Sequence, residues 1–158
     1  MPHPIVRALS IVLLTGAGVL RCIAAPLPAG ATVFANHCAV CHGPEAAGIP
    51  GSFPSLHEQI VAFAKTPAGR EYLVMVLTTG LMGELQVGGN TYHGVMPAQS
   101  TLSELEVAAV LNYLGSGLGK LKPPPAPIAA SEVGEIRARH PDKSPQNTRA
   151  LRPSPSGQ

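Results

Sequence analysis

The five residues Cys38-Ala39-Val40-Cys41-His42 carry the strongest chemical signal in this chain. Their pattern, C-x-x-C-H, is the attachment signature of c-type haem. Two thiols three positions apart at a helix end can each form a thioether with one haem vinyl group, and the adjacent imidazole is then held under the iron as an axial ligand. The motif therefore predicts one covalently bound haem c, with Cys38 and Cys41 as attachment points and His42 as a ligand of the iron.

Other uses of a cysteine pair fit the chain less well. A redox dithiol of the thioredoxin type needs a strand-helix-strand pattern, which the rest of the chain does not show. A structural zinc site needs four ligands, but the chain has only three cysteines and no second pair. A simple disulfide is awkward at this spacing on a helix and leaves His42 without a role. We therefore expect no metal other than the haem iron.

Length and composition agree with a small haem protein. The 158 residues allow one domain, or one domain with appendages. Aromatic side chains are scarce, with three Phe, three Tyr and no Trp, so a covalently held haem would supply core volume that the side chains do not. The formal net charge of +2 excludes a strongly basic nucleic-acid-binding protein, and we expect no nucleic-acid partner.

Residues 1–25 have the layout of a secretory signal peptide, with an early arginine, a mostly apolar run over 8–20 and small residues at 23–25. A retained membrane anchor needs about 20 apolar residues, whereas this run is shorter and stops at Arg21. The mature chain is therefore expected to begin near Pro26 and to lie in the periplasm. Any membrane association is then expected to come through a partner.

Three segments of the mature chain carry helical signals. Thr66-Pro67 is an N-cap followed by proline at the first helical position, and its helix is predicted to end near Gly80. Ser103 and Glu106 have the spacing of a capping box, and the helix that they begin is predicted to end near Gly115. A shorter apolar stripe at helical spacing lies before the first of these, at Leu56, Ile60 and Phe63.

Over residues 30–119 the chain resembles the class I cytochromes c. Gly30 and Phe34 have the spacing that these proteins use where the first helix crosses the last, residues 109–114 look like their closing helix, and residues 90–97 look like their methionine-ligand loop. The resemblance implies an all-α fold in which several helices wrap around one covalently bound haem. It is closest to the small periplasmic mono-haem carriers of bacteria and to the haem subunits of dehydrogenases.

The resemblance also implies a sixth iron ligand, Met96, which precedes Pro97 and follows the family's Tyr-x-Gly-x pattern. Met82, in the segment 80–89, is a competing ligand without a family match, and His93 is a second alternative. Met75 falls within an apolar helical stripe and is expected to belong to the core.

Two supporting residues are implied by the family. Pro54 is expected to turn its carbonyl toward the ring of His42 and so to fix the ligand's orientation, although Pro50 is an alternative because the loop between them aligns in two ways. Tyr92 is expected to donate a hydrogen bond to a haem propionate.

The residues after 119, where the family resemblance ends, differ from the preceding domain in charge and composition. We divide the chain into a signal peptide (1–25), a cytochrome c domain (26–119) with a net charge of −4, and a proline-rich tail (120–158) with a net charge of +4 and two possible short helices. Two readings of the tail remain open: a mobile segment, or a strap docked on the haem domain or on a partner. Docking would bury Ile136 and Leu151.

These features predict periplasmic one-electron transfer by a haem ligated by His42 and Met96. The protein would be a free carrier or the electron-transfer subunit of a dehydrogenase complex, and not itself an enzyme. Its partners would be redox proteins, such as a dehydrogenase subunit, an oxidase or another cytochrome. The alternative is a haem enzyme or a gas-binding sensor whose sixth iron position is open.

Overall fold

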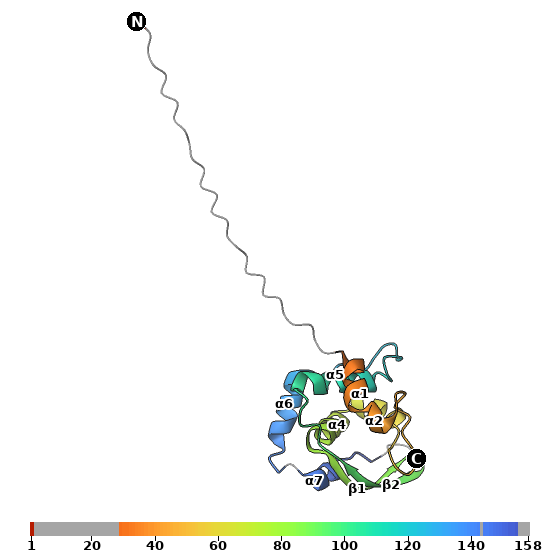
Figure 1. Ribbon diagram of the computed structural model, residues 1–158. Coiled ribbons are helices and arrows are strands. Elements are labelled where there is room, and N and C mark those ends of the chain that lie inside the picture. The colour runs from red at the N-terminus through yellow and green to blue at the C-terminus, as the bar shows by residue number, and fades with distance from the viewer. Residues whose placement is uncertain (2–28, 143, 155–158) are drawn as a thin grey trace.

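The computed structural model describes Met1 and residues 29–142 and 144–154 (Figure 1). Apart from Met1, the predicted signal peptide lies outside these residues. In chain order the elements are α1 (Gly30–His37), α2 (Ala39–His42), α3 (Glu58–Ala64), α4 (Pro67–Thr79), β1 (Leu81–Val87), β2 (Asn90–Met96), α5 (Glu104–Gly115), α6 (Ala130–Arg139) and α7 (Pro145–Ala150). The fold is mostly helical, as predicted. None of the helices in the described part of the chain is both long enough and apolar enough to span a membrane.

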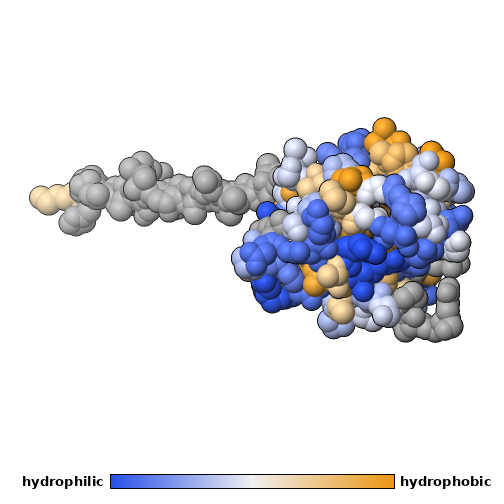
Figure 2. Space-filling model, turned by 90° about the horizontal axis from the view of Figure 1, so that it is seen from below, coloured by the Kyte–Doolittle hydropathy of each residue, from blue (hydrophilic) through white to orange (hydrophobic). Residues whose placement is uncertain are grey.

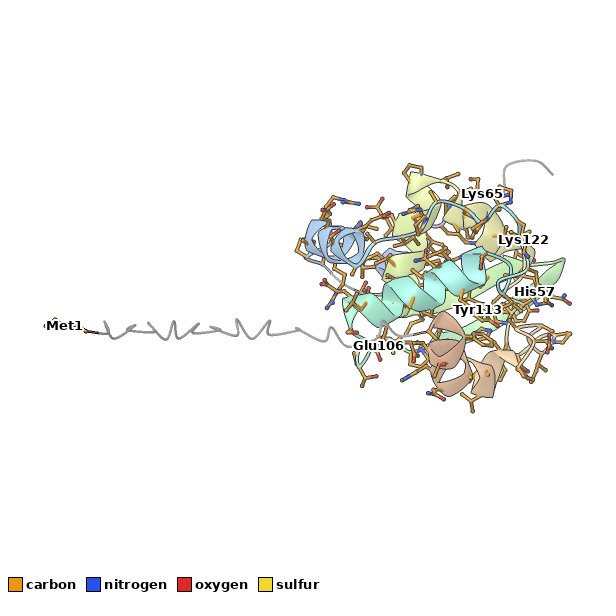
Figure 3. The ribbon with its side chains drawn as sticks, turned by 90° about the horizontal axis from the view of Figure 1, so that it is seen from above. Met1, His57, Lys65, Glu106, Tyr113 and Lys122 are labelled. Atoms are coloured by element: carbon orange, nitrogen blue, oxygen red, sulfur yellow. The ribbon has the colours of Figure 1, made fainter. Side chains whose placement is uncertain are left out.

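The first and last helices of the predicted cytochrome domain cross at close range. Phe34 of α1 packs against Tyr113 of α5 with the ring centroids 5.9 Å apart (Figure 3). A Cβ atom on Gly30 would collide with the carbonyl oxygen of Ala109 and would lie 2.7 Å from the Tyr113 Cβ. The absence of a side chain at position 30 therefore allows α1 to approach the backbone of α5.

The predicted helix ends are present. Thr66 Oγ1 accepts a hydrogen bond from the Gly69 amide at 3.1 Å, and α4 stops at Gly80, whose φ of +89° favours glycine. In α5, Ser103 and Glu106 form the reciprocal capping box, with the Glu106 carboxylate accepting from the Ser103 amide at 2.9 Å. The helices α4 and α5 therefore fix the two ends of the segment between them, residues 80–103.

The segment between α4 and α5 contains an antiparallel hairpin, β1–β2, which the sequence analysis did not predict. Its register pairs Leu81 with Met96 and Val87 with Asn90, and Gly88-Gly89 makes the turn with positive φ at both residues. Two consecutive left-handed residues match the twist of the flanking strands, which is why such turns close tight hairpins. The fold is therefore a helical cytochrome-type fold with a small sheet added at the methionine segment.

The tail lies along the side of the cytochrome domain. The helix α6 contacts α4 and α5, and α7 contacts α4 and β1 (Figure 1). Ile136 is 2% exposed, and Leu151 is partly buried against the core. The described part of the tail is thus a docked strap rather than a detached segment.

Polar contacts attach the strap at several points along its length. Asn112 of α5 holds the backbone of Ile128 with two hydrogen bonds, of 2.9 and 2.7 Å. Arg70 of α4 donates to Glu132 of α6, with Nε 2.7 Å from Oε1. Further along, Glu71 of α4 accepts from His140 at 2.8 Å. The pairs run in both directions, since Arg70 of α4 binds an acid of the tail and Glu71 of α4 binds a histidine of the tail.

Candidate haem site

The junction between α1 and α2 places both cysteines and the histidine on one cavity. The Cys38 amide continues α1 by donating to the Phe34 carbonyl, and the Cys38 carbonyl accepts from the His42 amide, each at 2.9 Å. One helical turn therefore separates the two thiols, and all three side chains line the same cavity. Neither thiol is in a disulfide.

The electrostatic environment of Cys38 differs from that of a redox dithiol. Burial, with a smaller contribution from the neighbouring Cys41, raises the pKa of the Cys38 thiol to about 11. Reactive dithiols have lowered pKa values because a cation, a metal or a helix N-terminus stabilises the thiolate. The neutral, buried Cys38 thiol is therefore unlike the nucleophile of a thioredoxin-type site.

The ring of His42 is oriented by a backbone carbonyl. Nδ1 donates to the Pro54 carbonyl oxygen at 2.8 Å, which places the proton on Nδ1 and leaves Nε2 with a free lone pair. Burial lowers the pKa of His42, more than the bond to Pro54 raises it, and the side chain is 7% exposed. A neutral imidazole with one fixed nitrogen and one free nitrogen is the form that binds a metal.

The hairpin forms another part of the cavity wall. Side chains along a strand alternate between its two faces, and the paired register puts one alternate set from each strand on the cavity side. These residues are Leu81, Gly83 and Leu85 of β1 and Tyr92, Gly94 and Met96 of β2; Val95, outside this alternation, also borders the cavity. Two thiols, an imidazole and a thioether therefore line one cavity.

The alternative sixth ligands lie elsewhere. Met82 follows Leu81 on β1, is 36% exposed and lies 3.2 Å from Gln146 Nε2 of α7. Met75 is buried within α4 and does not line the cavity. His93 pairs with Glu84 in the hairpin, is exposed and does not line the cavity either. Of these candidates, Met96 alone lines the cavity together with His42.

The apolar lining of the cavity is suited to a haem. The cavity has a volume of about 290 Å³, and α3, α4 and α5 contribute apolar side chains to its walls, among them Ile60, Leu73 and Leu111. Gly83 pairs with Gly94 in the hairpin. A Cβ on Gly94 would meet no atom within 4 Å, whereas one on Gly83 would lie 3.4 Å from the Arg149 side chain. At Gly94, therefore, no side chain stands between the strand and a planar group in the cavity.

Tyr92 and Pro54 both belong to this cavity, Tyr92 with only 7% of its surface exposed. The role of Tyr92 toward a propionate stays a prediction. In the residues that the structure describes, no group of three or more His, Cys, Asp or Glu side chains comes together to hold a further metal ion.

The sequence analysis missed the residues of β1 that line the cavity. Their signal was present: Leu81-x-Gly83-x-Leu85 mirrors Tyr92-x-Gly94-x-Met96, and both show the two-residue period of a strand. The glycine at the centre of each set conceals that period, because glycine has no side chain to mark a buried face.

Comparisons with known proteins agree with this geometry. The family model described as cytochrome c matches residues 27–117. Two proteins named cytochrome c-552 from Thermus thermophilus are each 40% identical over 112 residues, which is 70% of this chain and 85% and 75% of theirs. The cytochrome c subunit of a quinone alcohol dehydrogenase from Gluconobacter oxydans is 31% identical over 111 residues, covering 69% of this chain and 22% of that protein.

Proposed function

The chain belongs to the cytochrome c family, carries a covalently bound haem c and transfers electrons, and from this we propose that it is a periplasmic one-electron carrier whose iron is ligated by His42 and Met96. Cys38 and Cys41 hold the haem through thioethers. The observation that supports the proposal is that His42 and Met96 both line one largely apolar cavity.

The residues of the chain would bind and orient the haem for electron transfer, and no covalent bond of a substrate would be made or broken. Haem iron supplies a reversible one-electron change, and axial histidine and methionine give it a higher reduction potential than two histidines would. Pro54 holds the ring of His42 so that Nε2 stays available. Met96 would hold the iron from within the same cavity and exclude water and small ligands from it, and the apolar lining lowers the local dielectric constant.

An open sixth position, as in a haem enzyme or a gas sensor, is the competing function. Catalysis at a haem needs room for a substrate and groups that move protons. The described residues that line the cavity include no Asp, Glu, Lys or Arg, and His37 is the titratable imidazole there besides His42. Together with Met96 on the cavity wall, this lining supports a closed carrier rather than an enzyme.

The location and the partners form the second part of the proposal. The pattern of residues 1–25 supports export, because haem is attached to such proteins outside the cytoplasm. The likeness to a dehydrogenase subunit supports association with a redox protein, either as a free carrier or as a subunit. The mass of the purified mature protein tests export, since cleavage near Pro26 plus one haem fixes a single expected value.

The ligand assignment is tested by two matched methionine variants of the holoprotein. Ferric haem with a bound methionine sulfur has a weak absorption band at the red edge of the visible spectrum. We expect Met96→Ala to abolish this band and to lower the reduction potential, and Met82→Ala to leave both unchanged. A band that survives in Met96→Ala and is lost in Met82→Ala would reverse the assignment.

A further inference from the structure

The strand β1 has an open edge that the tail covers. Among the described residues, β2 is the one strand that pairs with β1. The other edge of β1 therefore has no strand beside it, and proteins generally cover or protect such an edge. Two arginine side chains of the tail reach this edge. Arg149 Nε donates to the Glu84 carbonyl at 2.9 Å, and Arg152 Nη2 donates to the Gln86 carbonyl at 2.8 Å.

Arg152 also connects the hairpin to a second wall of the haem cavity. Its Nη2 donates to Gln59 Oε1 of α3 at 2.6 Å, and its guanidinium carbon lies 6.0 Å from the centre of the Phe63 ring. One side chain therefore joins β1 to α3, which contributes Ile60 to the cavity.

The arginines extend from a fixed part of the tail. In α7, Thr148 is 1% exposed, and Ser144 caps the helix by accepting from the Asn147 amide at 3.1 Å. Leu151 packs against the main core. Seen from the side of the hairpin and α7, the surface is largely hydrophilic (Figure 2), which agrees with polar contacts joining the two elements there.

The hairpin needs such support because of its own composition. An isolated two-stranded hairpin is at best marginally stable in water. This one contains Gly83 and Gly94 in its strands and Gly88-Gly89 in its turn, and glycine within a strand adds conformational freedom without packing. One face of the hairpin borders the haem cavity rather than a protein layer. The contacts at the edge of the hairpin therefore contribute more to its stability.

We propose that Arg149 and Arg152 are positioning residues that brace the outer edge of β1 and hold the hairpin closed, with Met96 toward the iron. Both lie beyond residue 117, the last that the family model matches. The inference rests on the proposed ligation of the iron by Met96. It adds a reason why Met96 stays at the iron and keeps the sixth coordination position closed. An external ligand binds only the fraction of molecules in which Met96 has moved away, so the brace would lower the apparent affinity for such a ligand.

Imidazole binding to the full-length ferric holoprotein tests the brace. We expect Arg149→Gln and Arg152→Gln each to raise the apparent imidazole affinity about threefold, and the double variant about tenfold, because each removes a charge-assisted hydrogen bond to the backbone of β1. Arg149 is exposed, and the half-buried Arg152 also loses its bond to Gln59. Amide hydrogen exchange of residues 81–96 should quicken by a similar factor. Arg137→Gln is the matched control, since it makes the same charge change in α6, where Arg137 lies 3.8 Å from Glu104.

The proposal is overturned if the double variant stays within twofold of the wild type in both measurements, or if Arg137→Gln produces the same increases. If the wild-type protein lacks the methionine absorption band, ligation by Met96 is wrong, and hydrogen exchange alone then decides whether the arginines brace the hairpin. An equal loss of global stability without any gain in imidazole affinity would assign the arginines a purely structural role and would also overturn the proposal.

Discussion

Replacing Ile136 by alanine measures how strongly the tail is attached. Ile136 lies in α6 with 2% of its surface exposed and belongs to the main hydrophobic core. The change removes three buried carbon atoms and leaves a cavity between α6 and the helices it contacts. We expect a loss of about 2–3 kcal/mol in the free energy of unfolding, near the lower end of the range for such truncations because alanine slightly favours the helix.

Thermal unfolding of the ferric holoprotein, followed by far-ultraviolet circular dichroism, reports this loss. For a chain of this size the midpoint should fall by about 5–10 °C. Ile49→Ala makes the same chemical change at a side chain that is 51% exposed and should cost less than about 1 kcal/mol. Limited trypsin digestion should also cut the Ile136→Ala tail sooner. Equal midpoints and equal digestion rates for the two variants would refute the docked position of α6.

Two further predictions concern the helix crossing and an ion pair. Gly30→Ala should destabilise the protein by at least about 2 kcal/mol in a denaturant titration, because its Cβ would collide with the Ala109 carbonyl; Gly89→Ala, a turn position with open space, should cost about 1 kcal/mol from its positive φ. Hydrogen bonds from Arg70 hold the pKa of Glu132 below its ordinary value of 4.5. The stability that this carboxylate adds is therefore present above pH 4.5 and is lost as the pH falls through the lowered pKa. In a pH series of unfolding free energies, the gap between wild type and Glu132→Gln should shrink on acidification, and a gap that widens would contradict the pairing.

The parts of the fold that could be predicted from the sequence depend on local signals. The C-x-x-C-H motif, the Thr66-Pro67 helix start and the Ser103 capping box each act within one helical turn, so residue identity and spacing suffice to recognise them. The close approach at Gly30 was also predictable, but through the family resemblance rather than through local physics.

The hairpin and the course of the tail could not be predicted in the same way, because they depend on distant contacts. The glycines of the hairpin give weak strand signals, and its register follows from a turn of two left-handed residues and from the cavity on one face. The charge difference between domain and tail indicated association but not its location. The location depends on pairs such as Arg70 with Glu132 and Asn112 with Ile128, which lie 62 and 16 residues apart.

The measurement that most directly tests the central claim is the proton NMR spectrum of the ferrous holoprotein labelled at its methionine methyl groups. A methyl held against the iron lies over the haem ring, whose ring current shifts its resonance far upfield. We predict one such methyl, present in Met82→Ala and absent in Met96→Ala. A spectrum with every methionine methyl at an ordinary position, or with the shifted signal retained in Met96→Ala, would contradict ligation of the iron by His42 and Met96.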